Sequence, residues 1–158
     1  MHVPINHDHA MLAGSHLAAS HPSARMTLHG RRILVLDDDP LAAVIASLDL
    51  EDAGAPFVLV HDEASANAAL DQAMADGRPF DAAVLDVNLG NGRTSRSVAE
   101  RLRAKGVPFV LHTADPDALR TSADTWTPAD GSAPIVLAKP APAGALAQVL
   151  TRLMPGSD

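Results

Sequence analysis

Residues 33–40 of this 158-residue chain read Ile-Leu-Val-Leu-Asp-Asp-Asp-Pro, and this stretch decides the fold. A short, wholly apolar run is typical of a strand that is buried on both faces, as in a parallel sheet. Four further runs of this kind follow, at residues 57–60, 82–85, 109–111 and 135–138. We therefore expect an α/β fold, a doubly wound five-stranded parallel sheet with helices on both faces.

The segments between these runs carry apolar residues at helical spacing. Each helix is expected to present one apolar face. The three clearest stripes are Leu41, Val44, Ile45, Leu48; Ala66, Ala69, Leu70, Ala73; and Leu146, Val149, Leu150, Leu153. The spacing from Ser97 to Glu100 is that of a capping box, so Thr94 or Ser97 is expected to cap a helix that ends at Gly106. A further helix is predicted to begin near Pro116 or Asp117.

Composition narrows the classes of protein that the chain can represent. The formal net charge of −7 argues against a nucleic-acid-binding surface, and the absence of Cys excludes disulfides and thiolate sites. No apolar run reaches the ~18 residues of a membrane span, and no signal peptide is recognisable. We expect a cytoplasmic protein with no membrane partner.

The chain divides into two parts by composition. Residues 1–30 hold six of the eight His and show no helical or strand period, which predicts a flexible His-rich N-terminal extension. Residues 31–156 are expected to form one domain. Because the last predicted helix ends near the end of the chain, no output domain is expected to follow.

Polar residues follow every strand at the point where it ends, but His61 and Asp62, which follow the second strand, are expected to lie away from the centre of the sheet. The other polar residues are the candidates for a shared site. They are Asp37 and Asp38 after the first, Asp86 after the third, Thr113 after the fourth, and Lys139 after the fifth. Ligand sites of open parallel sheets lie beyond the carboxyl ends of the strands. With the strand order 2-1-3-4-5, these side chains are expected to meet at one edge.

The chemistry of this set favours phosphoryl transfer. Clustered carboxylates repel one another, and Mg²⁺, which prefers carboxylates, waters and phosphate oxygens, removes that conflict. One carboxylate can then act as a nucleophile towards phosphorus while Lys139 neutralises charge on the phosphoryl oxygens and Thr113 donates a hydrogen bond. The Asn91-Gly92 turn is expected to let the backbone pass close to the site.

From Arg31 to about Met154 the chain resembles the receiver domain of response regulators. Four motifs carry the resemblance, each at the end of a predicted strand: ILVLDDDP (33–40), DAAVLDVNLG (81–90), VLHTA (110–114) and LAKP (137–140). The resemblance implies a flavodoxin-like (CheY-like) three-layer sandwich. It also implies a role in two-component signalling, in which the domain accepts a phosphoryl group from a partner's phosphohistidine.

The resemblance assigns roles to individual residues. Asp86 would be the phosphoacceptor, and the Mg²⁺ cofactor would be held by Asp38 directly, by Asp37 through water, by Asp86 and by the Asn88 backbone carbonyl. Thr113 would be the switch hydroxyl and Lys139 the phosphate-binding lysine, followed by a cis bond to Pro140.

The implied partners are a sensor histidine kinase or a histidine phosphotransfer protein, and a downstream protein that the sequence does not name. The chain would signal through its surface and would be no enzyme beyond its own phosphorylation and slow dephosphorylation.

The chain departs from the family pattern at several positions. Val136 stands where the family usually has Tyr or Phe, so an aromatic switch is not available. The loop after Asp86 lacks the usual Pro. Asn88, Ala114 and Asp115 lie where side chains modulate hydrolysis in the family, and we expect a phosphorylated lifetime of minutes.

Two other functions are compatible with parts of this pattern. A receiver fold can act as an adaptor without phosphorylation. An aspartyl-phosphate hydrolase like those of the haloacid dehalogenase superfamily would use Asp37 as its nucleophile, although Leu41 occupies the position of its Thr or Val. A simpler interpretation is that the Asp residues before Pro40 only start a helix, which explains one of the three well.

Overall fold

The computed structural model describes residues 27–117, 119, 126–128 and 130–154. Five parallel strands form one sheet in the order β2-β1-β3-β4-β5, which confirms the predicted topology. The strands are β1 (Ile33–Leu36), β2 (Phe57–Val60), β3 (Ala82–Leu85), β4 (Phe109–Thr113) and β5 (Val136–Ala138). β1 and β3 are completely buried, as their continuous apolar sequences predict.

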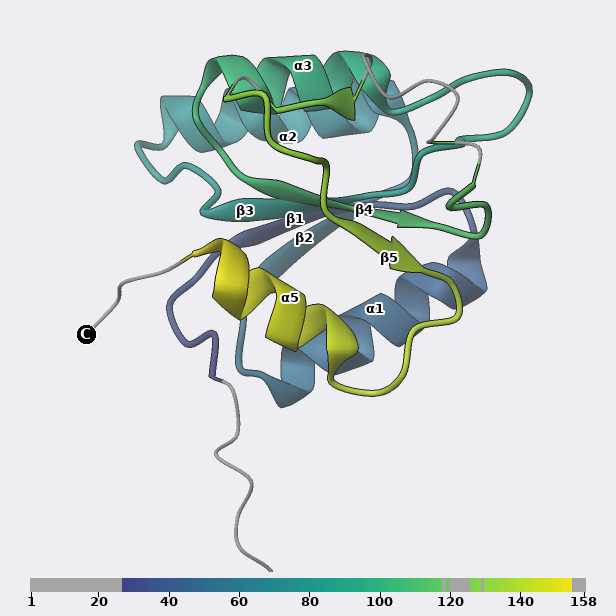
Figure 1. The fold of residues 1–158 in the computed structure, drawn as a ribbon. Helices are drawn as coiled ribbons and strands as arrows, with labels where there is room; N and C mark the ends of the chain where they lie inside the picture. Colours follow the sequence, from purple (N-terminus) through teal and green to yellow (C-terminus); the bar gives the residue numbers. More distant parts are fainter. Residues whose placement is uncertain (1–26, 118, 120–125, 129, 155–158) are drawn as a thin grey trace, which may run out of the picture.

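Helices cover both faces of the sheet, giving three layers (Figure 1). They are α1 (Pro40–Asp52), α2 (Glu63–Ala75), α3 (Arg96–Ala104) and α5 (Ala145–Leu153). One apolar core lies between the sheet and α2 and α3, and a second lies between the sheet and α1 and α5. In the part of the chain that the structure describes, no helix is long and apolar enough to span a membrane.

Two predicted segments fall wholly or partly outside the described residues. Residues 118 and 120–125 of the helix predicted to begin near Pro116 or Asp117 lie outside the described part of the chain, and so do residues 1–26 of the predicted extension. Leu28 is nevertheless buried, and its backbone N–H donates to the carbonyl oxygen of Ala53 at 2.8 Å. The packed part of the chain therefore begins ahead of Arg31.

The apolar stripe of α1 faces solvent, in contrast to the usual burial of such a face. Leu41, Val44, Ile45 and Leu48 are 69%, 53%, 43% and 56% exposed. The buried face of α1 consists of Ala43, Ala46 and Leu50. α1 is apolar on two sides, and its small alanines let the helix axis approach the sheet and α5, so the alanine side is the one that packs.

Leu48 and Leu50 give a matched test of this orientation, because they lie on one helix and differ in burial. We expect Leu50→Ala to lower the free energy of unfolding by about 2–5 kcal/mol, since it opens a cavity in the core. Leu48→Ala should change it by less than about 0.5 kcal/mol. Urea titration followed by the fluorescence of Trp126, which is 3% exposed, measures both. Equal losses would show that the stripe is buried.

The start of α3 differs from the prediction. Ser95 is the residue before the helix and makes no side-chain capping bond, while the Thr94 hydroxyl accepts from the Arg96 N–H at 3.4 Å. Ser97 lies inside the helix, and its hydroxyl donates to the Glu63 carboxylate of α2. The predicted capping box is wrong because Ser97 finds its partner on the neighbouring helix.

The start of α5 depends on α1. Gly144 precedes α5 in a left-handed conformation and offers no side-chain cap. The Asp49 carboxylate of α1 accepts hydrogen bonds there from the backbone N–H groups of Gly144, Leu146 (3.0 Å) and Ala147 (3.4 Å). These N–H groups have no partner within their own helix, so Asp49 satisfies them from 95 residues upstream.

Candidate functional site

Three carboxylates meet at the carboxyl edge of the sheet, as predicted. Asp37 follows β1 and Asp86 follows β3, and these neighbouring strands end in register at Leu36 and Leu85. One carboxylate oxygen from each of Asp37, Asp38 and Asp86 lies within 4.8 Å of the others. Asp37 and Asp86 are buried while Asp38 is exposed, so the cluster is open to solvent on one side.

Lys139 brings a positive charge into this cluster. It follows β5, and its Nζ lies 2.7 Å from Asp37 Oδ2 and 2.9 Å from Asp86 Oδ2. Only 12% of the lysine side chain is exposed. The ammonium therefore bridges two buried carboxylates that would otherwise repel each other.

Burial and the contacts between Lys139 and the carboxylates have opposite effects on the pKa values of the site. It raises the pKa of Asp86 to about 6, although the hydrogen bond and charge of Lys139 act in the opposite direction. Burial alone would lower the pKa of Lys139, but its hydrogen bonds to Asp37 and Asp86 outweigh this and raise it. At neutral pH the structure thus holds an ammonium next to a carboxylate that takes up a proton easily.

The raised pKa of Asp86 predicts a measurable titration. In metal-free protein the Asp86 carboxyl should titrate near pH 6, well above its ordinary value of 3.8. The folded state then binds the proton more tightly than the unfolded state. The Asp86 contribution to stability is therefore complete below pH 3.8 and is lost as the pH rises through about 6. Carboxyl ¹³C shifts of wild type and Asp86→Asn measure it, and a midpoint near pH 4 would contradict the prediction.

Of the three consecutive Asp residues, one caps a helix and two belong to the carboxylate cluster. Asp39 caps α1, because its carboxylate accepts from the N–H groups of Leu41 at 2.9 Å and Ala42 at 3.4 Å. The Asp39 N–H in turn donates to Asp37 Oδ1 at 3.0 Å, which fixes that side chain. The helix-start interpretation is thus right for Asp39, and it leaves Asp37 and Asp38 for the cluster.

The loop after β3 approaches the cluster at Gly90. Gly90 has a φ of +72°, and a Cβ atom added there would lie 3.2 Å from Asp38 Oδ2. Nothing lies within 4 Å of a Cβ added to Gly92. The close approach that the structure shows is therefore at Gly90, and the predicted approach at the Asn91-Gly92 turn stays a prediction.

Thr113 and Asn88 lie beside the cluster, and their predicted roles remain predictions. Thr113 is buried at the end of β4, its carbonyl accepts from the Lys139 N–H at 2.8 Å, and its hydroxyl accepts from the Asp115 N–H at 3.2 Å. The Asn88 N–H donates to Asp86 Oδ1 at 3.3 Å. The Lys139-Pro140 peptide bond is cis, as the resemblance implies.

His61 also takes part in the site, although its place after β2 suggested a position away from the centre. Its Nδ1 lies 2.9 Å from the Asp37 carbonyl oxygen, within hydrogen-bond distance. The predicted strand order already indicated this contact, because β2 pairs with β1 and the residue after β2 therefore neighbours the residue after β1. His61 thus supports the backbone that carries Asp37.

Comparisons with known proteins identify the fold. No protein-family profile matches the chain, and no curated protein matches its sequence. A response regulator receiver protein from Burkholderia phymatum is 22% identical with a TM-score of 0.62, over 80% of this chain and 97% of that one. The receiver domain of a sensor histidine kinase from Pseudomonas aeruginosa, with magnesium in its active-site cleft, is 24% identical with a TM-score of 0.62, over 80% of this chain and 99% of that one.

A third structure, the response regulator PhyR from Brucella abortus, is 19% identical with a TM-score of 0.66. It matches 82% of this chain, which spans only 50% of PhyR. The fold of this chain is that of response regulator receiver domains, as the sequence motifs predict.

Proposed function

We propose that this chain is a phosphorelay receiver that accepts a phosphoryl group on Asp86 from a phosphohistidine of a partner protein. One observation carries the proposal: Lys139 bridges Asp37 and Asp86 in a three-carboxylate cluster that opens to solvent at Asp38. In a receiver fold, this is the arrangement that phosphoryl transfer to a carboxylate requires. General signalling through a phosphorelay follows from the fold and the cluster together.

The transfer itself is a substitution at phosphorus. An Asp86 oxygen forms the new P–O bond, and the P–N bond to the donor imidazole breaks with its electron pair staying on the imidazole. Asp86 must be ionised to attack, and it is ionised at a pH above its raised pKa. The hydrogen bond from Lys139 stabilises this ionised form. The Lys139 ammonium can then bind the phosphoryl oxygens and neutralise their charge, because it already lies beside the Asp86 carboxylate.

The carboxylate cluster fits a Mg²⁺ ion. Three hard oxygen ligands from Asp37, Asp38 and Asp86 lie close together, and the exposed side at Asp38 leaves room for the waters that Mg²⁺ retains. The ion would neutralise charge on the phosphoryl oxygens. The Asn88 carbonyl, as the resemblance implies, would complete the set from the protein.

The proposed partners follow from the same chemistry. A donor must present a phosphorylated imidazole, as a sensor histidine kinase or a histidine phosphotransfer protein does, and the reaction belongs in the cytoplasm. We propose no catalysis beyond the phosphorylation of Asp86 and its slow hydrolysis. Val136 is half-buried and packs against the core on the side of α2 and α3. Because this side chain is not aromatic, we propose that the signal is relayed without an aromatic side chain at this position.

Acetyl phosphate tests the proposal without a partner protein. Incubation with acetyl phosphate and Mg²⁺ should add one phosphoryl group, which intact-mass spectrometry detects. Chelation of Mg²⁺ by EDTA should reduce labelling at least about tenfold, because the carboxylates then lack their counter-ion. A chain that takes up no phosphate while properly folded would instead be an adaptor that works without phosphorylation.

A further inference from the structure

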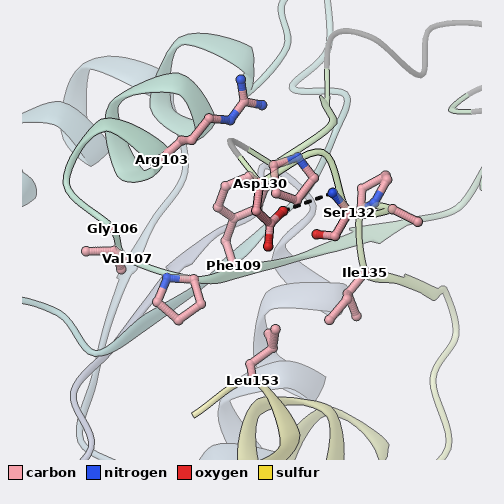
Figure 2. A pocket seen from close by; sticks show the side chains of 12 residues that line it. Arg103, Gly106, Val107, Phe109, Asp130, Ser132, Ile135 and Leu153 are labelled. Carbon is pink, nitrogen blue, oxygen red and sulfur yellow. Dashed lines mark hydrogen bonds between the residues drawn. The ribbon is translucent and has the colours of Figure 1, made fainter. Parts of the chain in front are cut away.

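A cavity of about 330 Å³ lies at the amino-terminal ends of β4 and β5, on the opposite edge of the sheet from the carboxylate cluster. Its walls come from the end of α3, the turn before β4, the loop before β5 and the end of α5 (Figure 2). The volume falls within the range of small-molecule sites in proteins. The cavity is thus large enough for a ligand and separate from the proposed phosphorylation site.

Most of the cavity wall is apolar. The apolar side chains are Val107, Pro108, Phe109, Pro128, Ala133, Pro134, Ile135 and Leu153. Ile135 is 41% exposed, although it immediately precedes a strand. A wall of this kind binds the hydrocarbon or aromatic body of a ligand and leaves its orientation to the few polar groups present.

Arg103 is the cation of this wall, and its guanidinium is poorly satisfied. Its Nε and Nη2 atoms are shielded from water and have no hydrogen-bond partner in the part of the chain that the structure describes. Arg101, two residues earlier on α3, instead binds the Asn67 and Asp71 side chains. Shielded N–H groups without an acceptor are unfavourable, and the group that would best satisfy them on a guanidinium is an anionic oxygen.

The protein itself does not supply that oxygen among its described residues. Asp130 lines the same cavity, but no ion pair joins it to Arg103, and its carboxylate accepts from the Ser132 N–H at 2.9 Å (Figure 2). Asp130 also repels a second anion near the loop before β5. An anionic group is therefore favoured on the α3 side, at Arg103, and disfavoured on the loop side.

We propose that this cavity binds a small amphipathic anion, with its carboxylate, sulfonate or phosphate group on Arg103 and its apolar body against Phe109, Ile135 and Leu153. Because the Nε and Nη2 atoms are shielded from water in this structure, the arginine side chain must rotate towards the cavity to present these N–H groups to a ligand. β4 and β5 run from this cavity to Thr113 and Lys139. A bound anion would thus contact β4 at Phe109 and the residue just before β5, and these two strands carry the polar residues of the proposed phosphorylation site.

Two fluorescent probes that differ by one anionic group test the proposal. Anilinonaphthalene sulfonate carries the ring system and a sulfonate, and phenylnaphthylamine carries the same rings without it. We expect saturable binding of the sulfonate probe, with amide shifts at Val107, Phe109 and Ile135. Arg103→Gln should weaken the sulfonate probe at least about tenfold and leave the neutral probe unchanged, because a charge-assisted bond is lost.

Control variants separate this cavity from other surfaces. Lys105→Gln removes a nearby exposed charge, and Val44→Gln alters the exposed stripe of α1; both should leave the two probes unchanged. Ile135→Asp should weaken both probes, because it places a charge in the apolar wall. Three results overturn the proposal: no saturation below about 1 mM, equal sulfonate affinity in Arg103→Gln, or amide shifts confined to α1. The shifts are measured on wild type, so this outcome does not depend on any variant folding.

Discussion

Asp86→Asn should abolish labelling by acetyl phosphate and Mg²⁺, with no phosphoryl adduct left in the intact mass. The amide is close in shape to the carboxylate but cannot act as a nucleophile towards phosphorus. The substitution also removes a buried carboxylate beside Asp37, so the variant should fold at least as stably as wild type at neutral pH. Loss of labelling therefore reports lost chemistry and not lost structure.

Asp39→Asn is the matched control for this experiment. Asp39 is adjacent to the cluster in sequence, but it caps α1, and Asn caps a helix about as well as Asp. Labelling should persist in this variant. If Asp86→Asn were still labelled, and peptide mapping placed the phosphate on Asp37, the hydrolase alternative would replace the receiver proposal.

Lys139→Met should have the second large effect, on both stability and labelling. Methionine keeps the length of the side chain but removes the charge that bridges Asp37 and Asp86. Removing one partner of a buried ion pair typically costs about 3–5 kcal/mol in the free energy of unfolding. We expect about 3 kcal/mol in metal-free protein, at the lower end, because Asp86 can take up a proton. Urea titration measures it.

Mg²⁺ distinguishes this explanation from a simple packing defect. A divalent ion in the cluster replaces part of the missing positive charge, so Mg²⁺ should restore part of the stability of Lys139→Met. Labelling should remain at least about tenfold below wild type even with Mg²⁺, since no ammonium is left to follow the phosphoryl charge. The exposed Lys105→Met is the control and should change neither quantity. Wild-type stability of Lys139→Met without Mg²⁺ would show that the bridge contributes nothing.

The sheet could be predicted from sequence because its strands are short apolar runs that alternate along the chain with segments of helical spacing. The orientation of α1 could not. Apolar residues occur on two sides of this helix, and the spacing of Leu41, Val44, Ile45 and Leu48 is as regular as that of a buried face. Packing determines which side of α1 is buried, because the side with Ala43 and Ala46 fits closest to the sheet.

The site was predictable to the extent that it follows from strand ends. Asp37 and Asp86 converge because the neighbouring strands β1 and β3 end together, and the long side chain of Lys139 reaches both from the end of β5, on the far side of β4. The roles of His61 and Gly90 depend on how the loops after β2 and β3 fold back onto the first strand end, and local sequence does not encode that path. Arg103 was one of several basic residues on α3, and only the three-dimensional contacts show that its guanidinium is shielded.

The contact of Asp49 with the start of α5 has a consequence for how the chain is made. Synthesis proceeds from the amino terminus, so α1 leaves the ribosome long before α5 exists. The acceptor that starts the last helix is then already in place when residues 144–147 emerge. In a circular permutant in which α5 is synthesised before α1, the N–H groups at the start of α5 would have no acceptor until Asp49 is made, although every contact of the finished fold would be the same.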